Sequence, residues 1–313
     1  MTSVTCVGLA VADYVFGVDE TPGAPGKHFA RSYTEVGGGP AANAAVTVAS
    51  LGGTARYIGH VGADGVGERI VADLAALGVD VSRVRVTVDR QSPVSAVLVD
   101  AEGERTIVNF TDPGLYDDVD PVTVDDVGDA DAVLADVRWP AGAEWALAAA
   151  ADRRIPGLLD YDRSPDDVSA LLDAASHVAF GAEALAALSG TDDPSEGLRR
   201  VRSDTPAWLA VTGGADGVWW LEEGEVRHLP AFDVDVVDTL GAGDVFHGAL
   251  ALALGEGREP AGAVRFASAA AAVKCTRFGG RSGIPDRAEV DGLLRERSNG
   301  GDGVRERDDG GRS

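Results

Sequence analysis

Apolar segments suited to buried strands alternate with segments of helical periodicity along most of this 313-residue chain. Val4 to Ala10 and Ala55 to Val61 are strand-like runs, and residues 40–51 between them place small and apolar residues at helical spacing. The alternation resumes at residue 132 and continues to residue 275. Strands that alternate with helices in this way predict a mostly parallel sheet covered by helices on both faces.

The remaining elements are predicted by the same two patterns. Further helical segments are 68–77, 141–152, 166–174, 182–188, 195–202, 244–254 and 260–275. Further strand-like runs are Ala132–Asp136, Gly157–Tyr161, His177–Phe180, Trp208–Thr212 and a hairpin over 217–230.

A different pattern between residues 83 and 112 predicts a second, smaller layer of strands. Val94 to Val99 and Arg105 to Phe110 flank the turn sequence DAEG, as in a hairpin. Residues 12–35 also alternate weakly. We expect the segments 12–35 and 83–112 to form a small β layer beside the main sheet.

The charge balance excludes several classes of partner. The chain has 27 basic and 51 acidic residues, a net charge of −24, which opposes binding to nucleic acid and to anionic membranes. No apolar stretch reaches the ~18 residues of a membrane span, and the start lacks a basic signal region. Cys6 and Cys275 have no spacing for a disulfide framework or a zinc site. We therefore expect a soluble cytoplasmic protein.

The acidity and the scarcity of lysine favour a protein adapted to high salt. Lys27 and Lys274 are the two lysines of the sequence, and dense salt would screen the repulsion among the carboxylates. An ordinary acidic protein from a GC-rich genome is the alternative. Residues 1–296 are expected to form the folded unit. Residues 297–313 have no apolar residue beyond Val304, so we expect a disordered tail.

The heptad DTLGAGD, which ends at Asp244, carries the strongest chemical signal. It follows a strand-like stretch and opens a helix of small residues. Gly241, Ala242 and Gly243 would present free backbone N–H groups at the helix start, which is a cradle for phosphate or another anion. Asp244, in the first helical turn, would be a base for a hydroxyl group. An ordinary capped helix is the alternative interpretation.

Two further polar positions near the start of the chain suit a sugar. Asn43 follows the run Gly37-Gly38-Gly39-Pro40 and offers both a donor and an acceptor to hydroxyl groups. Asp13, just beyond the first strand, could accept hydrogen bonds from paired hydroxyls. A flexible loop before a helix and a solvated loop aspartate are the plainer alternatives.

A third glycine-rich segment suits a nucleotide. Thr212, Gly213, Gly214 and Gly217 follow a strand and could approach phosphates, although a simple connection into the next hairpin explains them equally well. The chain has no GxxxxGK[ST] sequence, which excludes a P-loop enzyme.

With the Asn43 segment and the DTLGAGD heptad both in place, the chain resembles the ribokinase-like (PfkB) carbohydrate kinases over about residues 3–291. The resemblance implies an α/β fold. It is a Rossmann-like three-layer sandwich with a mostly parallel central sheet and a small β-sheet lid, formed here by 12–35 and 83–112.

The resemblance also assigns roles to residues of this chain. Asp244 matches the catalytic base, and Gly241, Ala242 and Gly243 match the anion hole. The other matches are Asp13, Gly38 and Asn43 to sugar-binding positions, and Thr212, Gly213, Gly214 and Gly217 to a nucleotide-binding segment. ATP and Mg²⁺ are the implied cofactors. Glu183 matches the glutamate of the family's Asn-x-x-Glu motif, but Phe180 stands in place of the asparagine.

A K⁺ site is implied as well. The stretch Lys274–Gly283 resembles a loop that packs against the DTLGAGD turn, where some relatives hold a monovalent cation through backbone carbonyls. The matching carbonyls belong to Asp238, Leu240, Lys274, Arg277 and Gly279.

Within the family, the chain is most similar to ketose 1-kinases. Lys27, Asn109 and Arg138 match positions that 6-deoxy-6-sulfofructose kinase uses around its sulfonate, although the same groups could bind the 6-hydroxyl of fructose. We expect fructose to be converted to fructose 1-phosphate. Sulfofructose is the first alternative, followed by another sugar, sugar acid or nucleoside. A non-catalytic sensor is disfavoured because it would not need Asp244. A homo-oligomer is expected, because lid edges often pair between subunits.

Overall fold

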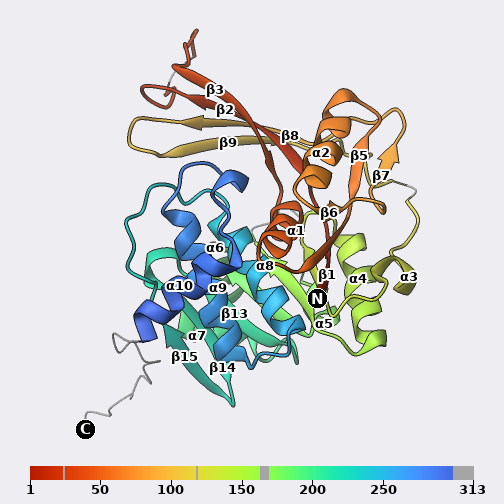
Figure 1. The fold of residues 1–313 in the computed structure, drawn as a ribbon, viewed down its shortest axis with the longest axis vertical. Coiled ribbons are helices and arrows are strands. Elements are labelled where there is room, and N and C mark those ends of the chain that lie inside the picture. Colours follow the sequence, from red (N-terminus) through yellow and green to blue (C-terminus); the bar gives the residue numbers. More distant parts are fainter. Residues whose placement is uncertain (24, 118, 163–168, 299–313) are drawn as a thin grey trace.

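The computed structural model of this chain describes residues 1–23, 25–117, 119–162 and 169–298 (Figure 1). These residues form a nine-stranded sheet, a four-stranded sheet and a two-stranded sheet, together with helices. The large and small sheets agree with the α/β fold class that the sequence predicts.

The nine-stranded sheet is parallel except at one end. In spatial order its strands are β15 (Glu225–Leu229), β14 (Val218–Glu222), β13 (Trp208–Thr212), β12 (His177–Gly181), β11 (Gly157–Tyr161), β10 (Ala132–Asp136), β1 (Ser3–Val7), β4 (Thr54–Ile58) and β6 (Val79–Asp80). Strand β14 runs opposite to the other eight strands, in the predicted hairpin with β15. The chain order reverses between β1 and β10, which makes this the topological switch point where α/β sheets bind ligands.

Side-chain alternation along the strands creates two apolar cores. Val4 and Cys6 of β1 point into one core, and Val7 points into the other. The first core contains α1 (Pro40–Ser50), α8 (Ala242–Gly255) and α9 (Pro260–Cys275). The second contains α4 (Pro140–Arg153), α6 (Ala182–Ser189) and α7 (Pro194–Val201). The other α-helices are α2 (Gly65–Ala76), α3 (Val124–Val127), α5 (Leu171–Ala174) and α10 (Arg287–Ser298).

A close helix contact brings α1 against α8. Gly248 of α8 has no side chain, and a Cβ there would lie 2.6 Å from the Ala44 carbonyl oxygen of α1. The glycine therefore lets the two backbones approach, which sets the distance between the helices that carry Asn43 and Asp244.

The four-stranded sheet projects from the large body (Figure 1). Its order is β3 (Ser32–Gly38), β2 (Val11–Gly17), β8 (Val94–Val99) and β9 (Arg105–Phe110). The predicted hairpin and the weakly alternating segment therefore meet in one sheet. Arg85–Thr87 differs from the expectation, because this segment is strand β7 and pairs with β5 (His60–Gly62) in a separate sheet.

Several boundaries differ from the sequence-based ones. The first run ends at Val7, where Gly8 turns the chain with φ 148°, and the second divides between β4 and β5. Helix α2 begins three residues earlier than predicted, because the Asp64 side chain caps it by accepting from the Gly67 N–H (2.8 Å).

Two predicted segments, the helix 166–174 and the tail 297–313, lie partly outside the described residues. Of the predicted helix 166–174, the described part is helical only over α5, and residues 163–168 are not described. Helix α10 extends to Ser298, so the first two residues of the predicted tail are helical, whereas 299–313 lie outside the described part. No helix in the described ranges is long and apolar enough to cross a membrane.

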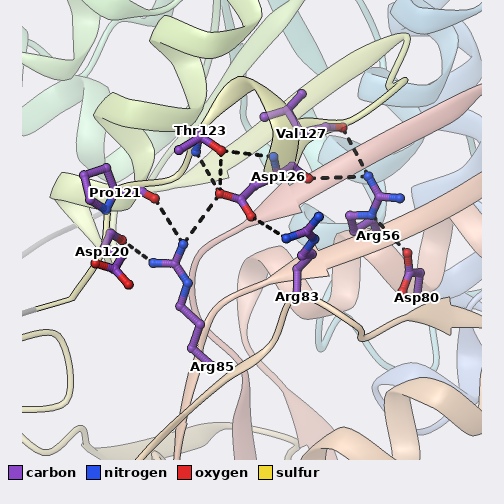
Figure 2. Close-up of polar contacts among 9 residues, drawn as sticks. All are labelled: Arg56, Asp80, Arg83, Arg85, Asp120, Pro121, Thr123, Asp126 and Val127. Atoms are coloured by element: carbon purple, nitrogen blue, oxygen red, sulfur yellow. Dashed lines mark hydrogen bonds and ion pairs between the residues drawn. The ribbon is translucent and has the colours of Figure 1, made fainter.

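A polar cluster fastens α3 to the edge of the large sheet (Figure 2). The Asp126 carboxylate accepts hydrogen bonds from the backbone N–H (3.0 Å) and hydroxyl (2.8 Å) of Thr123. It also pairs with Arg83 at 3.1 Å and Arg85 at 3.8 Å. Arg56 of β4 donates to the carbonyl oxygen of Asp126 (3.4 Å). The Asp126 carboxylate thus connects a helix cap to two arginines, and the Asp126 backbone carbonyl adds the third.

Candidate active site

The candidate site lies where the carboxyl ends of the parallel strands meet the start of α8. Asp136 ends β10, Thr212 ends β13, and Asp160 is the fourth residue of β11. Parallel strands bring their carboxyl ends to one edge of a sheet, so residues far apart in sequence converge there.

Asp244 and Asn43 are in direct contact. Asp244 is the third residue of α8, and its Oδ2 accepts a 2.6 Å hydrogen bond from Nδ2 of Asn43 on α1. The helix begins after Gly241, whose φ of 75° lies in the left-handed region that favours glycine. The fold therefore brings together the two glycine-rich motifs of the sequence.

The turn before Asp244 leaves backbone donors free. Within the described part of the chain, the N–H groups of Gly241 and Gly243 have no acceptor, whereas that of Ala242 donates to the Thr239 carbonyl (3.2 Å). The predicted anion hole is thus only partly open, because its middle N–H is used in the turn. The free N–H groups and the helix dipole make the turn suitable for an anion.

The environment of Asp244 shifts its acidity toward neutrality. Burial, together with the charge of Asp160, raises the pKa of Asp244 to about 6, while the Asn43 hydrogen bond and His247 act in the opposite direction. A carboxylate with this pKa is largely ionised at neutral pH and can still accept a proton from a hydroxyl group.

A buried imidazole and carboxylate lie behind Asp244. His247, one helical turn later, places Nδ1 2.9 Å from Oδ2 of Asp160. Burial lowers the pKa of His247, but the charges of Asp160 and Asp244 raise it above its ordinary value overall. From the sequence, a structural role is the default expectation for His247, although its i+3 spacing from Asp244 places it on the same helix face.

Asp136 positions the turn after β1 and the first turn of α1. Its carboxylate accepts from the N–H groups of Leu9 (2.9 Å), Ala41 (3.0 Å) and Arg138 (2.9 Å). Burial is the main cause that raises the pKa of Asp136 to about 7. One side chain thus fixes the turn after β1 and the start of α1.

Arg281 is a residue of this site that the sequence analysis did not single out. Its Nε donates to Oδ1 of Asn43 (2.8 Å), and its Nη2 donates to the Gly38 carbonyl (2.8 Å). Its Nη1 is buried and has no partner among the described residues. Its signal was weak, because it lies in a glycine-flanked loop 238 residues from Asn43.

The consecutive glycines of β3 make room for two charged side chains. A Cβ on Gly37 would lie 1.8 Å from Arg281 Nη1, and one on Gly38 would lie 2.2 Å from Asp13 Oδ2. Asp13 lies in β2 and not in a loop. Burial raises its pKa, opposed by the contact with the Ser95 hydroxyl and by the charge of Arg281. The two glycines therefore leave the space that the Arg281 and Asp13 side chains fill beside β3.

The three residues matched to sulfonate binding lie in different settings. Asn109 of β9 accepts from the Ser95 hydroxyl (2.8 Å), which connects it to Asp13. Arg138 pairs with Asp162 (3.0 Å). Lys27 is exposed between β2 and β3 and has no ion pair with a described residue. The structure thus links Asn109 to the site but brings no anion-binding trio into contact.

A pocket of about 690 Å³ lies beside the turn and suits a nucleotide. Thr212, Gly214 and Gly217 line one part of it, and Ala242 and Gly243 line another. Its remaining walls are mostly apolar, as expected for a base and ribose.

Two predicted cofactor residues lie outside the pocket lining. Gly213 packs behind it, where a Cβ would lie 2.5 Å from the Trp219 ring. Glu183 is exposed in the first turn of α6, after the strand that pairs with β13.

The loop expected to hold K⁺ is occupied by protein groups. Lys274 is fully buried, and its Nζ donates to the Asp238 carbonyl oxygen (2.8 Å). The Asp238 carboxylate accepts from the N–H groups of Leu240 (2.9 Å) and Gly279 (2.8 Å) and binds Arg105 of β9. The Lys274 carbonyl accepts from the Arg277 N–H (3.1 Å). The described residues contain no cluster of three His, Cys, Asp or Glu that could hold a metal.

Comparisons with known proteins agree on one family. A family model described as pfkB family carbohydrate kinase matches residues 1–287. The ribokinase of Bacillus subtilis (strain 168) is 30% identical over 299 residues, covering 94% of this chain and 100% of the relative. The ATP-dependent ribose-1-phosphate kinase of Halopiger xanaduensis is 33% identical over 303 residues, covering 95% and 99%. A crystal structure of a candidate ribokinase from Agrobacterium tumefaciens aligns with a TM-score of 0.91 and 39% identity, covering 95% and 99%.

Proposed function

The chain belongs to the pfkB family of carbohydrate kinases, and from this premise we propose that it phosphorylates the 1-hydroxyl of fructose with ATP. The products would be fructose 1-phosphate and ADP. The observation that carries the phosphotransfer is the Asn43–Asp244 contact of 2.6 Å beside a turn with free backbone N–H groups. A base, an anion cradle and a nucleotide-sized pocket then adjoin one another.

The proposed reaction is a direct transfer. Asp244 accepts the proton of the acceptor hydroxyl, whose oxygen attacks the γ-phosphorus in line while the bond to the β-phosphate oxygen breaks. The N–H groups of Gly241 and Gly243 stabilise the charge on the transferred phosphoryl group. Asn43 holds the Asp244 carboxylate in position, and Arg281 holds Asn43.

Mg²⁺ would enter with the nucleotide. Mg²⁺ is usually bound through substrate phosphates together with one or two carboxylates. Glu183, at the start of α6, is the carboxylate that the family motif assigns to this assembly. When bound, the ion neutralises phosphate charge.

The choice of fructose rests on the charges near the acceptor side. Arg138 is already paired with Asp162 at 3.0 Å, and Lys27 is exposed. A sulfonate would need unpaired cations, whereas hydroxyl groups suit Asp13 and Asn109. These observations support a neutral ketose over 6-deoxy-6-sulfofructose.

A sugar phosphate is the second candidate. The Halopiger relative is named for ribose 1-phosphate, and Arg281 contributes a buried Nη1 with no partner among described residues at the acceptor side. A guanidinium donor of this kind suits a phosphate oxygen.

An acceptor screen tests the proposal. Initial rates of ADP release would be measured in molar KCl with fructose, ribose, ribose 1-phosphate, 6-deoxy-6-sulfofructose and adenosine. We expect the highest kcat/KM with fructose and ³¹P–¹³C coupling to carbon 1 in the product. A higher value with ribose 1-phosphate would select the second candidate. Phosphate on carbon 6 of fructose would contradict the assigned hydroxyl.

A further inference from the structure

Lys274 is a buried cation beside the turn at the start of α8, residues 238–243, which is the turn that presents the free N–H groups. It lies in the last turn of α9 and is 0% exposed. Lysine is almost never fully buried unless its ammonium group is paired. Its Nζ donates to the Asp238 carbonyl oxygen at 2.8 Å and lies 3.8 Å from Asp238 Oδ2. The ammonium therefore binds the first residue of the DTLGAGD heptad.

Asp238 joins this turn to the loop after α9. Its carboxylate accepts from the Leu240 and Gly279 N–H groups, and its own N–H donates to the Cys275 carbonyl (3.1 Å). Arg105, from the small sheet, binds the same carboxylate. Two cationic side chains thus surround one carboxylate in a nearly closed environment.

These groups do not fit an additional K⁺. The resemblance implies the Asp238 carbonyl as a K⁺ ligand. This carbonyl already accepts a hydrogen bond from the Lys274 ammonium group. The Lys274 carbonyl accepts an N–H group of the helix end. A cation on the same carbonyl would lie close to Lys274 and Arg105, whose two positive charges already exceed the single charge of Asp238.

We propose that the Lys274 ammonium takes the place of a monovalent cation at this turn, so that the chain needs no K⁺ for phosphoryl transfer. This inference rests on the proposed function. Lys274 is a positioning residue, because it acts through the Asp238 carbonyl and not on the reacting atoms. It holds the start of the turn that presents the Gly241 and Gly243 N–H groups.

The test compares wild type, Lys274→Met and Arg56→Met. Methionine keeps the length of the lysine stem and vacates only the position of Nζ. Arg56→Met is the control, because it removes a different cation, which is partly buried and paired with Asp80 at 3.0 Å, away from the turn. Each protein is assayed in KCl and in tetramethylammonium chloride at equal ionic strength, so that general screening is the same.

We expect wild type and Arg56→Met to differ by less than about twofold between the two salts, since screening is matched. Lys274→Met should lose at least about tenfold in kcat in tetramethylammonium, as expected for a lost charge-assisted hydrogen bond. K⁺ should restore its activity saturably, with little change in the KM for ATP. A wild-type kcat that is more than about twofold higher in KCl than in tetramethylammonium chloride would overturn the proposal. A folded Lys274→Met that is equally active in both salts, or that K⁺ does not rescue, would overturn it as well.

Thermal melting in the same two salts separates this inference from the proposed function. Even if no sugar is phosphorylated, K⁺ should raise the Tm of Lys274→Met selectively and leave wild type and Arg56→Met without a selective shift. An equal selective shift in wild type would overturn the inference. If Lys274→Met cannot be purified, the response of wild type decides: a selective K⁺ shift or activation rejects the inference, and equal behaviour in the two salts supports it.

Discussion

The Asn43 side chain donates a 2.6 Å hydrogen bond to Asp244, joining the first turns of two helices that are 201 residues apart in sequence. Its other amide atom, Oδ1, accepts from Arg281 Nε at 2.8 Å. Because a guanidinium can only donate, this contact orients the amide so that its NH₂ group faces Asp244. Asn43 thus positions the carboxylate and also favours its ionised form.

The substitution Asp244→Asn should abolish sugar-dependent ADP release. The amide keeps the shape of the side chain but cannot accept the proton, and loss of a general base typically costs about 10²–10⁴ in rate. Calorimetric titration should show ATP affinity within a few-fold of wild type. A variant that kept more than about a tenth of the wild-type turnover would rule out Asp244 as the base.

The pH dependence of kcat/KM should report the same carboxylate. Asp244, with a pKa of about 6, must be ionised to act as a base, so the rate should rise with pH through about 6. Asn43→Leu removes the hydrogen bond that lowers this pKa, so the rising limb should move to higher pH by about one unit or more. For both proteins the KCl concentration is fixed, ATP is saturating, and the sugar is varied from well below its KM. An unmoved limb would argue against the coupling.

The main sheet could be predicted because its signal is local. Each parallel strand is an apolar run bounded by a helix, so β10 and β11 were found at their observed bounds. The separation of β5 from β4 was not predictable in this way. Gly59 allows it, because a Cβ there would lie 2.5 Å from the Gly8 carbonyl oxygen, and that contact depends on the folded neighbour.

In the candidate site, too, the residues within local motifs could be predicted and those that depend on distant contacts could not. Asp244 and Asn43 belong to continuous glycine-rich motifs, whereas Arg281 joins them through contacts across more than two hundred residues. The family resemblance of the sequence predicts the Asp238 carbonyl as a cation ligand. The buried ammonium of Lys274 that binds it is set by the packing of α9 and not by any local pattern.

The cluster in Figure 2 predicts a difference between two adjacent aspartates. Asp126→Ala removes the side-chain half of the capping box, which accepts from the Thr123 N–H, and the partner of Arg83, so the free energy of unfolding should fall by about 1–3 kcal/mol. Asp125→Ala, an exposed neighbour in the same helix, should change it by less than about 0.5 kcal/mol. Urea unfolding in molar KCl measures both. Equal losses would show that the cluster adds nothing beyond removal of an acidic residue.

Stability should depend on salt because of the net charge of −24. The Debye length grows from ~3 Å near molar salt to ~30 Å at 0.01 M, so separated carboxylates begin to repel as KCl is diluted. We expect the Tm to fall steeply over that range. A matched series in sucrose, which adds no ions, separates screening from solute exclusion. A Tm that stays constant from molar to millimolar KCl would remove the argument for adaptation to high salt.

The final prediction concerns the acceptor and uses Arg138. In the structure its Nη2 lies 3.0 Å from Oδ2 of Asp162, with side-chain exposures of 27% and 51%. A pair this exposed contributes only about 0–1 kcal/mol, so Arg138→Met should leave folding nearly unchanged. With fructose the residue meets at most a neutral hydroxyl, and we expect kcat/KM to fall less than about tenfold.

A sulfonate acceptor would behave differently at the same position. Removing a desolvated cation from an anionic partner costs roughly 2–5 kcal/mol, at least about thirtyfold in kcat/KM. Steady-state assays of wild type and Arg138→Met with both sugars therefore discriminate between them, with Lys27→Met as the parallel variant on the exposed loop. Preference for 6-deoxy-6-sulfofructose that collapses in Arg138→Met would mean that Arg138 leaves Asp162 to bind substrate. Preference for fructose with a small effect would mean that the Arg138–Asp162 pair persists during turnover, because a neutral acceptor offers the guanidinium no charge to exchange for Asp162.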